Sequence, residues 1–154
     1  MRQIVWVLGI LVFLMWGASS GLYALEAGLN LGTISGPRET CYGVSAGMGM
    51  LIPMVKVELE YYRAANAYPF PNTATAGLKF RPKFGALAPY VGVGIGAEFD
   101  RLKLKLGEYQ KFSFIGGGLH LFLTSMISLR GDVRFLHFSG YRRTRISGGI
   151  FLHL

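Results

Sequence analysis

The chain has 154 residues, of which 51% are hydrophobic and 16% charged, with a formal net charge of +8. This length fits one domain, and a single cysteine, Cys41, excludes an intramolecular disulfide. The excess of lysine and arginine indicates an anionic partner, whose nature depends on where the charges lie.

The first 24 residues have the features of a secretory signal peptide. Arg2 supplies a basic start, residues 4–16 are apolar apart from Gly9, and small residues follow as far as Ala24. The apolar run is shorter than the roughly 20 residues that a membrane-spanning helix needs. We expect cleavage after Ala24, with Ser20 as a second position, which leaves residues 25–154 as one domain. A retained N-terminal anchor is the alternative.

After Ala24, apolar residues alternate with polar or small ones, and this period of two is typical of β-strands. The clearest case is residues 54–63, where Lys56, Glu58 and Glu60 interleave with four apolar positions. In chain order, the alternating segments are residues 25–32, 42–50, 54–63, 74–81, 91–100, 111–123, 129–135 and 145–154. Turn-rich stretches separate them, so the chain is predicted to be all-β.

The sixth segment breaks the alternation. Phe112 and Phe114 lie in one phase, Leu119 and the leucines after it lie in the other, and residues 116–118 between them are glycines. A β-bulge at these glycines would reconcile the two phases. With that assumption there are eight strands, which close into the smallest common barrel. The predicted fold is an eight-stranded antiparallel up-and-down transmembrane β-barrel.

The polar face of these strands is balanced in charge, with six acidic and six basic residues. They are Glu26, Lys56, Glu58, Glu60, Lys79, Arg81, Glu98, Asp100, Arg130, Asp132, Arg134 and Arg145. Buried ions are costly unless they are paired, so this balance favours an interior of ion pairs. Glycines on the same face would relieve crowding beside long basic side chains. The apolar face would then contact lipid. A soluble, lipocalin-like ligand-binding barrel with the opposite orientation is an alternative.

A second set of basic residues falls at one rim of the predicted barrel. With a periplasmic N-terminus, this rim is extracellular. The set comprises Arg63, Arg101, Lys103, Lys105, Lys111, Arg142 and Arg143. We hypothesise that these residues contact the phosphates of lipopolysaccharide, each contact contributing about 1 kcal/mol. A solvated basic rim without a ligand is the alternative.

Two further segments carry a resemblance to a known group of proteins. The run Pro89-Tyr-Val-Gly-Val-Gly-Ile-Gly96 and the last strand, Arg145 to Leu154, resemble the small outer-membrane β-barrel superfamily, with its OmpA-like transmembrane domain and opacity-type surface proteins. The resemblance implies a monomer in the cell outer membrane, placed there by the insertion machinery, with a structural or interaction role and no cofactor. A barrel this narrow should also conduct poorly.

One short motif keeps an enzymatic alternative open. The element His137-Phe-Ser139 resembles the His-x-Ser element of the outer-membrane lipid A deacylases, which implies catalytic roles for His137 and Ser139. A nucleophilic serine needs an imidazole base, and that base needs a carboxylate. No Asp or Glu follows Asp132, and Glu108 is the substitute that we consider. We regard a non-enzymatic barrel as the better prediction.

Other site classes find no support in the sequence. His120 and His153 are isolated and fit no metal-ligand spacing, so no metal site is predicted. The glycines recur on strands without a following helix, unlike a phosphate-binding loop. An exported barrel is also not expected to bind nucleic acid.

Overall fold

The structure is a computed structural model. It describes residues 25–35, 39–50, 54–65, 71–100 and 109–154. The predicted signal peptide, residues 1–24, lies outside the described residues. Among the residues that are described, no helix is long and apolar enough to cross a membrane.

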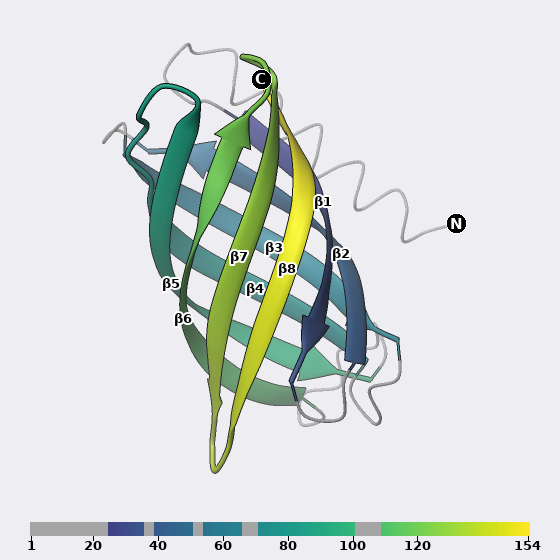
Figure 1. Cartoon of the computed structure of the whole chain (residues 1–154). Helices are drawn as coiled ribbons and strands as arrows, with labels where there is room; N and C mark the ends of the chain where they lie inside the picture. Colours follow the sequence, from purple (N-terminus) through teal and green to yellow (C-terminus); the bar gives the residue numbers. More distant parts are fainter. Residues whose placement is uncertain (1–24, 36–38, 51–53, 66–70, 101–108) are drawn as a thin grey trace.

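Eight strands form one closed barrel in which each strand pairs with its neighbours in the chain and β1 pairs with β8 (Figure 1). The strands are β1 (Leu25–Ile34), β2 (Glu39–Gly49), β3 (Val55–Ala64), β4 (Asn72–Phe80), β5 (Leu87–Phe99), β6 (Tyr109–Phe122), β7 (Ile127–Phe138) and β8 (Arg142–His153). All eight pairings are antiparallel. The predicted fold is therefore confirmed.

The two ends of the barrel differ in what they carry. The end at which β1, β3, β5 and β7 begin, and which holds Leu25 and His153, is called the terminal end below. The opposite end, at which these four strands finish, is called the distal end (Figure 1, bottom). Every strand runs from one end to the other, so residues far apart in sequence meet at each end.

The apolar face of the strands points outward and the charged face points inward. Leu29 is 68% exposed and Ile95 is 69% exposed, whereas Glu58 is 4% exposed and Arg134 2% exposed. An apolar exterior around a polar interior is the arrangement of a membrane-spanning barrel. It is the reverse of a lipocalin-like cup, whose apolar face would have to point inward, so that alternative is wrong.

Strand β6 is regular, and the β-bulge assumed from its sequence is absent. Residues 112–121 pair with β5, and 112–122 with β7, without a break in register. Phe112 and Phe114 consequently face the interior, where they are buried together with Leu136 and Phe138. Apolar rings thus occupy part of the interior near the distal end, beside the charged residues.

The interior glycines also have a wider role than the sequence indicated. A Cβ atom at Gly96 would collide with the Phe112 ring, and one at Gly94 with the Phe114 ring. A Cβ at Gly116 would come within 2.8 Å of Cγ of Arg134. The glycines therefore make room for aromatic rings as well as for basic side chains.

Candidate functional site

The interior holds six buried carboxylates and six buried cations among the described residues. Eleven of the twelve residues that the sequence placed there are buried. The exception is Asp100, which follows the end of β5 and is exposed. Its place in the balance is taken by Glu39, the first residue of β2, which is 5% exposed. The sequence could not identify Glu39 because it lies at a strand end, where the alternation begins.

Glu58 of β3 is the centre of the interior charge network. Its carboxylate accepts hydrogen bonds from Lys79 Nζ at 2.5 Å, Arg130 Nη1 at 2.6 Å and Arg134 Nη2 at 2.8 Å. These cations come from β4 and β7, so the contacts link β3 to its neighbour and across the interior to another wall. One carboxylate thus holds three cations in place.

The network continues from Glu58 towards the distal end. Arg134 Nη1 lies 2.6 Å from Glu60 Oε2, and Arg134 Nε donates to Asp132 Oδ2 at 2.8 Å. Arg145 of β8 also pairs with Glu60, and Tyr90 donates to Asp132 at 3.0 Å. Side chains of β3, β4, β5, β7 and β8 are therefore joined inside the barrel, and Asn30 of β1 joins them through hydrogen bonds with Glu60 and Arg130. This arrangement fills the middle of the interior.

At the terminal end, the two interior histidines belong to one hydrogen-bonded network, although the sequence presented them as isolated. Ser128 Oγ lies 3.1 Å from His120 Nδ1 and 2.7 Å from His153 Nε2. His153 Nδ1 lies 3.4 Å from Glu26 Oε2. Arg81 closes the network, since its Nη2 is 2.7 Å from Glu26 and its Nη1 is 3.2 Å from His120 Nε2. The pairings of β6 with β7, of β7 with β8 and of β8 with β1 bring these residues together, which the sequence alone does not show.

Ser128, His153 and Glu26 have the order of groups found in a serine-hydrolase triad. The Ser128 residue is completely buried, however, and its hydroxyl is also held by His120. A nucleophile must reach its substrate, so this arrangement is structural.

We expect a fluorophosphonate probe to leave Ser128 unlabelled in the folded barrel. Ser128→Ala should lower the free energy of unfolding by about 1–3 kcal/mol, because it leaves buried ring nitrogens unpaired. Labelling that disappears in Ser128→Ala would contradict this assignment.

Arg143 lies at the mouth of the distal end and not on the outer rim where the sequence placed it. Strand β8 begins at Arg142, so Arg143 shares the inward phase of Arg145. Its Nη1 lies 3.7 Å from Glu98 and 4.0 Å from Glu39. Arg143 is thereby engaged by interior carboxylates, and it is removed from the set of lipid-contacting residues.

Three predicted rim cations, Arg63, Lys111 and Arg142, are exposed on the outer face at the distal end. Arg63 pairs in register with Tyr42, and Arg142 with His137. The remaining predicted cations, Arg101, Lys103 and Lys105, lie outside the described residues.

The proposed catalytic pair is not assembled. His137 is half-buried and Ser139 is exposed just after β7, and no hydrogen bond joins them. The cross-strand neighbours of His137 are Ser113 and Arg142. Of the described carboxylates, six are buried inside the barrel and only Asp100 is exposed. Glu108, the substitute carboxylate, lies outside the described residues.

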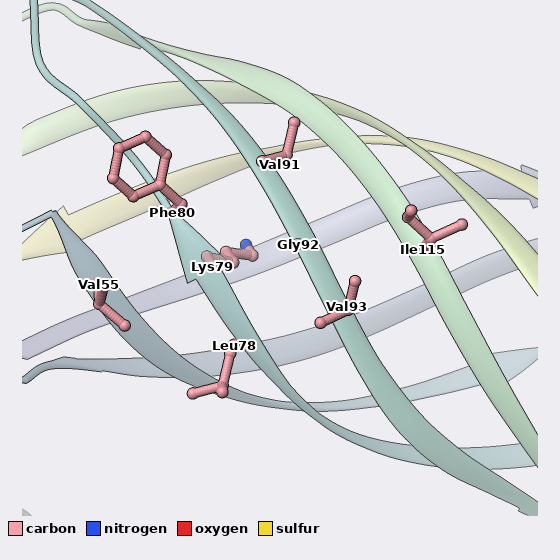
Figure 2. A pocket seen from close by; sticks show the side chains of 8 residues that line it. All are labelled: Val55, Leu78, Lys79, Phe80, Val91, Gly92, Val93 and Ile115. Carbon is pink, nitrogen blue, oxygen red and sulfur yellow. The ribbon is translucent and has the colours of Figure 1, made fainter.

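The outer wall also has a shallow groove between β3 and β6, with a volume of about 270 Å³ (Figure 2). Its lining is almost entirely aliphatic or aromatic: Val55, Leu78, Lys79, Phe80, Val91, Gly92, Val93 and Ile115. The one charged lining residue, Lys79, is committed to Glu58 through its ammonium group. The groove is therefore part of the lipid-facing wall and offers no reactive group.

No protein-family model and no curated protein matches this chain. Several solved structures are similar to it. The N-terminal β-barrel domain of Pseudomonas aeruginosa OprF is similar, with a TM-score of 0.71, 15% identity and coverage of 85% of this chain and 97% of that chain. Neisserial surface protein A gives a TM-score of 0.61, 13% identity and coverage of 84% and 96%. Ail of Yersinia pestis, in a phospholipid bilayer nanodisc, gives 0.55, 8% identity and coverage of 84% and 99%.

The chain has the fold of a small outer-membrane β-barrel. Its lipid-facing exterior and paired interior charges agree with that fold on physical grounds. The outward apolar face and the charged interior are the arrangement of a barrel whose strands span a membrane.

Proposed function

We propose that this protein is a non-enzymatic envelope barrel whose distal end faces outward and contacts lipopolysaccharide through exposed cations. The observation that carries this proposal is the separation of charge in the structure. Six carboxylates are buried inside the barrel and are engaged there by interior cations and by Arg143, and Asp100 is the one exposed carboxylate among the described residues, so positive charge predominates on the described outer surface.

The cations on the outer face lie at a level suited to lipid phosphates. Arg63, Lys111 and Arg142 are exposed at the distal end, where the outward-facing aromatic rings of Tyr42 and Phe135 are each about half exposed. Aromatic residues mark the interface of outer-membrane barrels. Basic side chains at this level would face the phosphate groups of the outer leaflet, and each contact would contribute about 1 kcal/mol.

The interior supports a structural role in place of a transport role. Glu58 and its three cations occupy the middle of the barrel, and Phe112 and Phe114 are buried nearer the distal end. A solute would have to break several buried ion pairs to pass, which is costly. We therefore favour a surface or envelope-stabilising protein over a porin.

The proposal predicts that lipopolysaccharide binding depends on the three exposed cations. Replacing Arg63, Lys111 and Arg142 together by glutamate should weaken binding about 100-fold, since three contacts of about 1 kcal/mol are lost. The measurement is titration of lipopolysaccharide onto the mature barrel in nanodiscs at fixed ionic strength. Lys83→Glu, at the exposed terminal end, is the matched control and should bind as the wild type does. Unchanged affinity in the triple variant would overturn the proposal.

A further inference from the structure

The outer face of β6, β7 and β8 carries a polar patch at its distal end, consisting of Lys111, Ser113, His137, Ser139 and Arg142. Ser113 pairs in register with His137, and His137 with Arg142, so the three lie side by side. Lys111 and Ser139 extend the patch further towards the distal end, and both are exposed. The outward-facing residues of these three strands include no carboxylate. The patch therefore presents two cations and several hydrogen-bonding groups to an anion.

A hollow lies on the same face, further from the distal end. Gly131 of β7 and Gly148 of β8 are direct cross-strand partners. A Cβ atom at Gly131 would meet nothing within 4 Å, and one at Gly148 would meet only the Arg130 carbonyl oxygen, at 3.5 Å. Leu119 and Leu31, their outer neighbours in register, are exposed. Gly131 and Gly148 thus form the floor of an apolar hollow, called the glycine slot below.

The spacing between the polar patch and the glycine slot matches the depth of one membrane leaflet. His137 and Gly131 are six residues apart on β7, which corresponds to roughly 20 Å along the strand. With a strand tilt of about 40°, the depth is roughly 15 Å, half of a hydrocarbon core of about 30 Å. If the patch lies at the outer interface, the slot lies near the middle of the bilayer, where acyl chains end.

We propose that the face of β6–β8 seats one phosphorylated glycolipid, the lipid A part of lipopolysaccharide, with a phosphate on the polar patch and an acyl chain in the glycine slot. This inference rests on the proposed function and gives the lipid a defined position. Charge decides the occupant: Lys111 and Arg142 attract an anionic head group, whereas a second copy of the barrel would bring the same cations against them.

Filling the slot should displace the chain without disturbing the barrel. Gly131→Leu adds a side chain into open space, and neither Gly131 nor Gly148 has a positive φ angle. Ala76→Leu is the matched control, because Ala76 is an exposed outward residue of β4 on another part of the wall. The experiment counts the lipid molecules retained by the detergent-purified mature barrel, by native mass spectrometry after incubation with diphosphorylated lipid A or with phosphatidylglycerol.

We expect wild type and Ala76→Leu to retain one lipid A, and Gly131→Leu to lose about tenfold in retention. Lys111→Glu with Arg142→Glu should lose a similar amount. If the charge reversals have no effect, the proposed function fails. If the charge reversals weaken retention while Gly131→Leu equals Ala76→Leu, only the seated-lipid inference fails. Equal retention of phosphatidylglycerol, or a dimer that Gly131→Leu dissociates, would also overturn the seated-lipid inference.

Discussion

Glu58→Gln is expected to lower the free energy of unfolding by about 3–5 kcal/mol, the usual cost of removing one partner from a buried ion pair. Glu58 is 4% exposed and holds Lys79, Arg130 and Arg134 at 2.5–2.8 Å. The amide would keep the shape of the side chain but remove the negative charge. Lys79 would lose its carboxylate partner, and Arg130 and Arg134 would keep only their ion pairs with Glu60 and Asp132, in an interior where unpaired charge is costly.

The measurement is urea unfolding of the mature barrel in lipid vesicles, followed by the difference in gel mobility between folded and unfolded chains. Asp100→Asn serves as the control, because Asp100 is an exposed carboxylate at the end of β5. Its effect should stay within about 0.5 kcal/mol, as for most surface substitutions. An equal free energy of unfolding for Glu58→Gln and Asp100→Asn would show that the negative charge of Glu58 does not stabilise the folded barrel.

Gly96→Ala is expected to destabilise the barrel by about 1–3 kcal/mol through overpacking. The three atoms nearest to a Cβ at Gly96 all belong to the Phe112 ring. Phe112 is 4% exposed and packs on Phe138 with ring centroids 4.8 Å apart, so it has little freedom to move away. The glycine is therefore required by the space that the aromatic ring fills.

A second substitution separates this explanation from a general intolerance of β5. Phe112→Leu shortens the ring that blocks the new methyl group, so Gly96→Ala should cost less in the Phe112→Leu background, by about 0.5–3 kcal/mol of coupling. Gly131→Ala is the control, since its Cβ would meet open space. The same urea titration is applied to the wild type, the two single variants, the double variant and the control. Strict additivity of Gly96→Ala and Phe112→Leu would refute the direct contact.

Much of the barrel could be predicted from the sequence, because the two-residue alternation of side chains along a strand depends only on neighbouring residues. Lys56, Glu58 and Glu60 alternate with apolar neighbours, and alternation alone fixes which side chains share a face. The balance of acids and bases then identified the inner face, since ions buried in a narrow interior must be paired. The prediction for β6 was wrong for the converse reason: Phe112 and Phe114 are apolar yet face inward, so polarity misassigned their phase.

The candidate site was likewise only partly predictable from the sequence. The sequence placed Lys111, Arg142 and Arg143 together at the rim because they lie at or beside predicted strand ends. The structure separates them: Lys111 and Arg142 are exposed, whereas Arg143 faces inward because β8 begins at Arg142 and not at residue 145. Glu39 was missed at a strand end, and the contact of His120 and His153 with Ser128 was missed because three strands supply it.

The sequence by itself determined the strand period, the number of strands, the charged inner face and the basic excess. The tertiary structure decided which charges meet, that Asp100 is outside and Glu39 inside, and that the glycines fit around rings as well as basic side chains. The physical reason is the range of the interactions. Alternation is set by adjacent residues, whereas the partners of Glu58, 21 to 76 residues away in sequence, are set by strand register and by closure of the barrel.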